Sequence, residues 1–141
     1  ITRINTNYTD SKLEVMESST LLYQEASYQI IGIAMEVHRE LGPGLKEVNY
    51  QDALEYEFQL NHIPYLREKR YRVMYKGKVL SRPYVADFLI DDKIILEIKS
   101  VPVIIDQHFA QTLNYLKVSG TKLGLILNFG AKSLAWQRVV L

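Results

Sequence analysis

The chain contains no cysteine among its 141 residues. This excludes disulfide bonds, cysteine zinc sites and thiol catalysis for these residues. The absence agrees with a reducing compartment, so we expect a cytoplasmic location. Long apolar runs are also missing: Ile30 to Met35, interrupted by Gly32, is far shorter than the ~20 residues that span a bilayer. We therefore expect no membrane as a partner.

A strong charge of either sign is lacking as well. Seventeen Lys and Arg stand against sixteen Asp and Glu, a net charge of +1. If the chain binds nucleic acid, its positive charge must be local. The length fits one domain, and an apolar content of 48% is enough for one core. Residues 1–21 are expected to be an N-terminal tail or loosely attached segment, and residues 22–141 the domain.

The spacing of apolar residues predicts an α/β domain with a mixed central sheet flanked by helices. Ser27 is the expected N-cap of a helix that stops at Gly42-Pro43-Gly44. A second helix follows from about Leu45, with Val48, Leu54 and Phe58 on one face. A period of two then predicts a hairpin at 70–79 with its turn at Lys76-Gly77. The remaining elements are expected to be strands at 84–90 and 94–100, a helix at 105–118, a strand at 123–129 and an edge strand within 133–141.

The two central strands carry the residues of most chemical interest. Glu97 and Lys99 are two apart, so they share a face of their strand. A tight turn at Asp91-Asp92 places Asp87 opposite Leu96 or Glu97, depending on register. Asp87 and Glu97 can therefore meet across the ladder, with Cβ atoms within about 5 Å. Their neighbours are apolar, and buried carboxylates are costly unless they are paired or bind a cation.

A hard divalent cation such as Mg²⁺ would resolve this conflict, with Asp87 and Glu97 as ligands and the carbonyl near Ile98 as a third. A bound metal lowers the pKa of a water ligand and offsets charge in phosphoryl transfer. Lys99 would orient or help deprotonate that water and stabilise the phosphate. We expect Mn²⁺ to substitute for Mg²⁺. The simpler alternative is an ordinary cross-strand Asp–Lys salt bridge.

A basic segment precedes these strands. Between Arg67 and Arg82 there are seven Lys and Arg and one acid, Glu68, a local net charge of +6. A face of alternating cations suits a phosphate backbone, and interleaved tyrosines suit base stacking. The alternative is a solvated strand face whose lysines discourage edge pairing. The cations expected on one face, as substrate-binding residues, are Arg70, Arg72, Lys76 and Lys78.

Residues 44–50, Gly-Leu-Lys-Glu-Val-Asn-Tyr, match the signature of the GxxExxY proteins, a branch of the PD-(D/E)xK nuclease superfamily. Similar matches follow in order over about residues 22–141, so the resemblance is more specific than any one motif. They include Ile31-Gly32, Glu36-Val37-His38, Leu41 to Gly44, the strand with Asp87, Glu97-Ile98-Lys99, Gln111 to Tyr115, Asn128-Phe129-Gly130 and Lys132-Ser133-Leu134.

This resemblance implies a restriction-endonuclease-like fold and metal-dependent hydrolysis of phosphodiester bonds in nucleic acid, expected to be DNA. It implies Asp87, Glu97 and Lys99 as the core motif, with Glu47 as a further acidic residue that holds metal. Ala86 stands where the superfamily has proline, which removes no ligand. A first-turn carboxylate that favours the helix dipole is the alternative for Glu47.

Gln111 and Tyr115 are four apart on the predicted helix and share a face. They resemble the QxxxY element of several exonucleases in the superfamily, which contacts substrate or metal-bound water. The alternative is a surface glutamine beside a core tyrosine. For His38 two interpretations stay open, a residue that lines the site and a half-buried histidine with satisfied hydrogen bonds, and we do not assign it as a ligand.

Two other functions remain open at this point. One is a non-catalytic module that keeps the nuclease fold and binds nucleic acid or protein. The other is an assembly protein that associates through its aromatic surface, for example as a homodimer.

Overall fold

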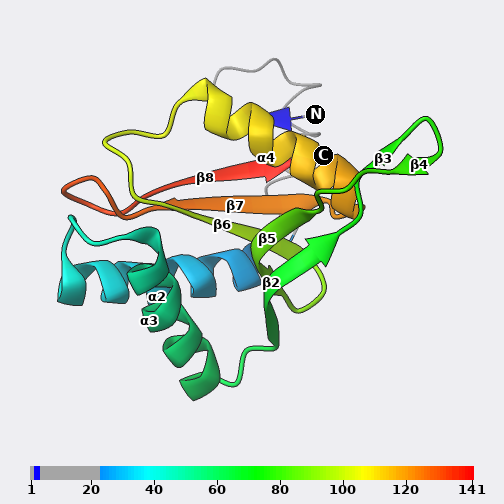
Figure 1. Cartoon of the computed structure of the whole chain (residues 1–141). Helices are drawn as coiled ribbons and strands as arrows, with labels where there is room; N and C mark the ends of the chain where they lie inside the picture. Colours follow the sequence, from blue (N-terminus) through cyan, green and yellow to red (C-terminus); the bar gives the residue numbers. More distant parts are fainter. Residues whose placement is uncertain (1, 4–22) are drawn as a thin grey trace, which may run out of the picture.

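The computed structural model describes residues 2–3 and 23–141. A six-stranded sheet in the order β1-β8-β7-β6-β5-β2 forms the centre, with α2 and α3 on one face and α4 on the other (Figure 1). Among these strands only β6 and β7 pair in parallel. The predicted α/β architecture, a mixed sheet flanked by helices, is confirmed.

The helices are α2 (Gln24–Leu41), α3 (Glu47–Leu60) and α4 (Asp106–Ser119). The strands of the large sheet are β1 (Thr2–Arg3), β2 (Tyr65–Tyr71), β5 (Tyr84–Ile90), β6 (Ile94–Lys99), β7 (Leu123–Asn128) and β8 (Ala135–Val140). A separate two-stranded sheet consists of β3 (Met74–Tyr75) and β4 (Lys78–Val79).

Two apolar cores lie on opposite faces of the sheet. The α2–α3 core contains side chains such as Ile30, Phe58 and Phe88, and the α4 core contains Leu116 and Ile126. Because both faces are covered, every residue of β7 is buried. This agrees with the nearly continuous apolar run that predicted the strand.

Two expectations about the first helices are wrong. Helix α2 begins at Gln24, so Ser27 lies inside it and is buried. Its hydroxyl donates to the Tyr23 carbonyl oxygen (2.9 Å), an i−4 bond that satisfies a serine within a helix. In α3, Val48 is exposed, and Tyr50 is buried in its place, with its ring stacked on Phe129 at 4.5 Å. Tyr50 can be buried because its hydroxyl donates to the Gly42 carbonyl oxygen (2.6 Å).

The predicted hairpin over 70–79 is also different. Strand β2 starts at Tyr65 and pairs with β5, and only the short β3–β4 hairpin turns at Lys76-Gly77 as expected. Both turn residues have positive φ (49° and 77°), as two-residue hairpin turns require. With two residues in the turn, Tyr75 stands opposite Lys78. Lys78 therefore shares a face with Tyr75, and the expectation of a face that carries only the cations is wrong.

The expected N-terminal segment is described only at Thr2 and Arg3, which pair with Val140 and Val139 of β8. The boundary between residues 21 and 22 lies outside the described residues. Strand β8, expected at an edge, lies between β7 and β1. In the described part of the chain, no helix combines the length and apolar character needed to cross a bilayer.

Candidate nuclease site

The site lies where β5 and β6 separate. Their ladder pairs Ile90 with Ile94, Leu89 with Ile95 and Phe88 with Leu96. Beyond Phe88, carboxylates replace the backbone acceptors. The Asp87 amide donates to Glu97 Oε2 (3.2 Å), and the Ile98 amide donates to Asp87 Oδ2 (2.7 Å). The structure thus brings Asp87 and Glu97 together. Of the two expected registers, it has the one in which Asp87 lies opposite Glu97.

Strand β5 also changes face at Asp87. Tyr84 and Ala86 belong to the α4 core, whereas Phe88 and Ile90 belong to the α2–α3 core. A regular strand would keep all four on one face. The partner strand shows the matching irregularity, because Glu68, at the position facing Asp87 in the register, has a φ of 57°. This local break in the pleat directs the Asp87 carboxylate towards β6 instead of into either core.

Burial and like charge act together on the two acids. Glu97 is only 5% exposed, and burial followed by the nearby Asp87 charge raises its pKa to about 8. Burial also raises the pKa of Asp87, and the Glu47 charge adds to this, against the opposing effects of the Ile98 amide and Lys99. Two adjacent carboxylates that resist ionisation are a favourable place for a cation.

Tyr84 is a site residue that the sequence did not reveal. Its hydroxyl donates to Glu97 Oε2 (3.0 Å), the same oxygen that accepts the Asp87 amide. The Tyr84 ring stacks on Tyr115 of α4 (3.9 Å, 10°) and on Tyr71 of β2 (5.7 Å, 13°). The only signal was a tyrosine three residues before Asp87, which regular alternation places on the opposite face.

Lys99, Gln111 and Tyr115 meet on the α4 side of the sheet. Lys99 Nζ donates to Gln111 Oε1 (3.4 Å). Burial raises the pKa of Tyr115, as do the charges of Glu97 and Asp87, whereas the hydrogen bond with Gln111 lowers it. The i, i+4 pair on α4 therefore lies beside the motif strand.

Glu47 lies at the rim. It is the first residue of α3 and is exposed, and its Oε2 accepts the Ser100 amide (3.2 Å). The Ser100 hydroxyl donates to the Leu45 carbonyl oxygen (3.0 Å), so this second residue missed by sequence reasoning ties the end of β6 to the start of α3.

The donor set supplies the oxygen ligands that Mg²⁺ prefers. Both hydrogen bonds that Glu97 accepts go to Oε2, which leaves Oε1 for a cation. Within residues 2–3 and 23–141, no three His, Cys, Asp or Glu side chains are close enough to form a complete metal cluster. The preformed part of the site is thus the Asp87–Glu97 pair, with Glu47 nearby and hydrogen-bonded elsewhere.

The basic segment divides into two parts. Arg67 does not face solvent as a free cation: its Nη1 bonds to Asp52 (2.7 Å) and Glu55 (3.1 Å), which ties β2 to α3. The four cations expected to bind substrate, in contrast, are all exposed: Arg70, Arg72, Lys76 and Lys78.

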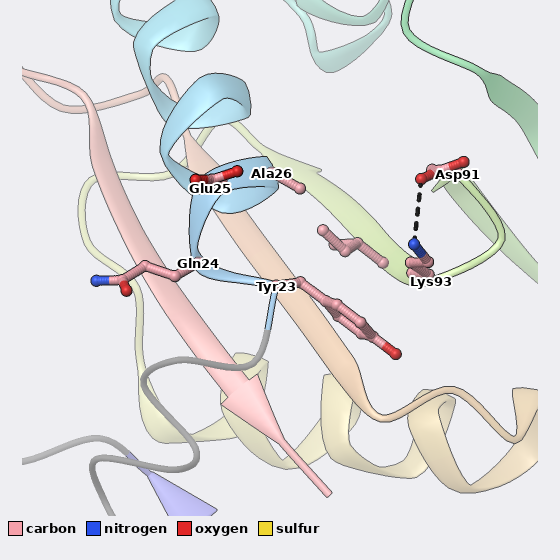
Figure 2. A pocket seen from close by; sticks show the side chains of 7 residues that line it. Tyr23, Gln24, Glu25, Ala26, Asp91 and Lys93 are labelled. Carbon is pink, nitrogen blue, oxygen red and sulfur yellow. Dashed lines mark ion pairs between the residues drawn. The ribbon is translucent and has the colours of Figure 1, made fainter.

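Two other features lie outside the site. His38 Nε2 is 2.9 Å from the Ala131 carbonyl oxygen and its ring stacks on Phe129, so its contacts are with the segment that follows β7. A surface pocket lies at the other end of the β5–β6 hairpin (Figure 2). There, Lys93 pairs with Asp91 (3.5 Å) and lies over the Tyr23 ring. The pocket includes none of the expected site residues.

Comparison with known proteins defines the class. A family model described as the PD-(D/E)XK nuclease superfamily matches residues 24–139. The chain belongs to this superfamily.

Among solved structures, the crystal structure of SSO0001 is similar, with a TM-score of 0.53 and 21% sequence identity. The match covers 64% of this chain and 47% of that one, so this chain spans about half the length of its structural relative. The likeness supports a restriction-endonuclease-like fold. The comparison with curated proteins gave no significant match.

Proposed function

We propose that the protein is a divalent-metal-dependent nuclease that hydrolyses phosphodiester bonds in DNA, and that it belongs to the GxxExxY branch of its superfamily. The observation that carries the proposal is the pairing of buried Glu97 with partly buried Asp87 at the point where β5 and β6 separate. Lys99 follows on the same strand, with its ammonium group bound to Gln111.

In this proposal Asp87 and Glu97 hold Mg²⁺, and Mn²⁺ can replace it. The Ile98 carbonyl and Glu47 serve as further ligands, directly or through water. When bound there, the ion would supply a water of lowered pKa and would offset charge on the phosphate. The chain prepares Glu97 for this task, because Tyr84 and the Asp87 amide fix one carboxylate oxygen and leave the other for the cation.

Lys99 is proposed to position the attacking water and to stabilise the scissile phosphate. Its ammonium group is held by Gln111, and its charge lowers the pKa of Asp87, and these two observations support the proposed role. Gln111 and Tyr115 are proposed to support the substrate from α4. Electrostatic groups fixed before the reaction stabilise developing charge without further reorganisation.

The test is cleavage of labelled single-stranded and duplex DNA, with RNA in parallel, in Mg²⁺ or Mn²⁺. Wild type should degrade DNA, and a Glu97→Ala/Lys99→Ala variant should lose this activity while keeping its circular dichroism spectrum. Equal slow degradation by both proteins would indicate a contaminant and reject the enzyme. Binding without any cleavage would instead support the non-catalytic module.

A further inference from the structure

The β3–β4 hairpin extends away from the large sheet (Figure 1). All four residues of its strands are exposed, and the Leu80 amide donates to the Val73 carbonyl oxygen (2.9 Å) to extend the ladder. We call residues 72–82 the basic hairpin. An isolated two-stranded hairpin is marginally stable in water. The apolar side chains of the hairpin are exposed, so packing against the rest of the domain does not explain why apolar residues stand there.

The basic hairpin combines apolar and positive groups. It contains four cations, Arg72, Lys76, Lys78 and Arg82, and no acid. Lys76 Nζ lies 5.5 Å from the Tyr75 ring centroid. Four apolar side chains are large and exposed: Met74 (56%), Tyr75 (58%), Val79 (45%) and Leu80 (42%).

A fitting partner must offer negative charge and flat apolar surface at the same place. Because Tyr75 stands opposite Lys78, one face of the hairpin combines an aromatic ring with a cation, and the opposite face carries the apolar pair Met74 and Val79. Phosphates bind the cations, and unpaired bases offer faces for stacking. A continuous duplex offers the same phosphates but keeps its base faces stacked inside.

The base of the hairpin is part of the nuclease site. The chain enters the hairpin after Tyr71 and leaves it into Tyr84, and these two rings stack at 5.7 Å. Tyr84 in turn stacks on Tyr115 and donates to Glu97. A strand that lies along the hairpin therefore meets the aromatic stack beside the acid pair.

We propose that the basic hairpin binds unpaired nucleotides next to the phosphodiester bond at the Asp87–Glu97 site. This rests on the proposed function and narrows its substrate to single strands or duplexes with an unpaired flank. An anionic membrane would also attract the cations, but membrane binding would not explain why the hairpin joins the aromatic stack at the acid pair.

Binding is measured by fluorescence anisotropy in EDTA, so that cleavage plays no part. The probes are a labelled oligothymidine strand and a blunt duplex of the same length. One variant, Met74→Ser/Tyr75→Ser, removes apolar surface, and a second, Lys76→Gln/Lys78→Gln, removes charge. The matched control, Arg39→Gln/Lys132→Gln, removes two exposed cations at the end of α2 and in the β7–β8 loop, segments on the far side of the molecule (Figure 1).

Wild type should bind the single strand more tightly than the duplex. The serine variant should lose about tenfold for the single strand, since stacking contributes roughly 1–3 kcal/mol per base, and should keep its duplex affinity. The glutamine variant should weaken both and reduce the salt slope for the single strand by about 1.4. The control should resemble wild type.

The proposal would be overturned by equal wild-type affinity for both probes, by unchanged strand binding in the serine variant, or by an equal loss in the control. Co-sedimentation with phosphatidylserine vesicles gives a further check. If the serine and glutamine variants lose the vesicle binding of wild type but keep its strand binding, the partner is a membrane and the proposal is also overturned. Strand binding that follows the expected pattern without any cleavage in Mg²⁺ would reject the nuclease and retain the hairpin as a binding surface.

Discussion

Tyr84 is buried, and its hydroxyl donates a hydrogen bond to Glu97 (3.0 Å). This bond favours the ionised carboxylate and lowers the pKa of Glu97, opposing the effect of burial. Tyr84→Phe keeps the stacked ring and removes only the hydroxyl. We therefore expect kcat to fall about tenfold with little change in KM, because a hydrogen bond to a charged group contributes roughly 1.5–3 kcal/mol.

The pH profile of kcat shows whether the Tyr84 hydroxyl positions Glu97 for the reaction or only stabilises the fold. Without the Tyr84 hydroxyl the pKa of Glu97 should rise, so the acid limb of the kcat profile should move to higher pH. Tyr71→Phe is the matched control, since Tyr71 stacks on the same ring and has no hydrogen bond to Glu97. An identical shift in both variants would mean that the hydroxyl of Tyr84 has no special role.

Glu97 itself makes the metal-free protein sensitive to pH. Its pKa is about 8 in the folded protein against an ordinary value of 4.5, so the folded state binds more protons between these limits. Raising the pH through this window therefore lowers the free energy of unfolding. Each pKa unit corresponds to about 1.4 kcal/mol, which places the loss at a few kcal/mol.

Glu97→Gln should flatten this dependence, because glutamine stays neutral and its oxygen still accepts the Tyr84 hydroxyl. Urea unfolding in EDTA at pH 5 and pH 8 measures the effect. Glu25→Gln, at an exposed position in the first turn of α2, is the control and should retain the slope of wild type. If the Glu97 variant is less stable than wild type at pH 8, the carboxylate has a stabilising structural partner and the pair is not a poised cation site.

At the scale of elements, α4 packs closely on β7 because Gly124 has no side chain. A Cβ there would lie 2.8 Å from Thr112 Cγ2 and 3.3 Å from Leu116 Cδ2, both on α4. Gly124→Ala should therefore push α4 away from the sheet and destabilise the protein by about 1–3 kcal/mol. The same shift should move Gln111 and Tyr115 from β6 and reduce cleavage.

Gly32→Ala provides the opposite case. Gly32 lies in α2 with nothing within 4 Å of an added Cβ, so alanine should stabilise the helix by up to about 1 kcal/mol. Thermal unfolding of both variants gives the comparison. Equal stabilisation by both substitutions would show that α4 can adapt at no cost and that its distance from β7 is not fixed by Gly124.

The sequence predicted the elements of the site better than their local geometry. Strand β5 begins and ends at the expected residues, and β6 stops one residue early, because apolar alternation and the Asp91-Asp92 turn determine this hairpin. The change of face at Asp87 could not be predicted, since it depends on the neighbouring β2 and its irregular residue Glu68. Regular alternation places Tyr84 and Phe88 on one face of β5 and Asp87 on the other. It therefore did not predict that Tyr84 contacts Glu97 beside Asp87.

The basic segment illustrates the same limit. Composition revealed the local charge, but charge alone does not say which cations have protein partners. Arg67 is bound by Asp52 of α3, which lies fifteen residues earlier in the chain. Strand alternation does not predict such a tertiary contact. Tyr75 and Lys78 share a face because the turn between them has two residues. A turn longer or shorter by one residue would shift the register and place them on opposite faces.

For the molecule as a whole, cation binding and folding should be coupled through the acid pair. Mg²⁺ bound to the folded protein and not to the unfolded chain raises stability, by about 2.7 kcal/mol at a concentration a hundred times its Kd. The cation must displace the proton that the Asp87–Glu97 pair retains when the pKa of Glu97 is about 8. The rise in Tm should therefore be small at pH 6 and reach several degrees at pH 8.

Differential scanning fluorimetry with Mg²⁺, Mn²⁺ or EDTA at the two pH values measures this coupling without requiring any cleavage. An Asp87→Asn/Glu97→Gln variant should lose the Mg²⁺-dependent gain at both pH values, whereas Asp91→Asn, at the far turn of the same hairpin, should keep it. A gain of equal size at pH 6 and pH 8, or one that persists in the Asp87→Asn/Glu97→Gln variant, would place the cation elsewhere on the protein. The raised pKa of the acid pair would then reflect burial without a ligand, and the separation of β5 and β6 would need another explanation.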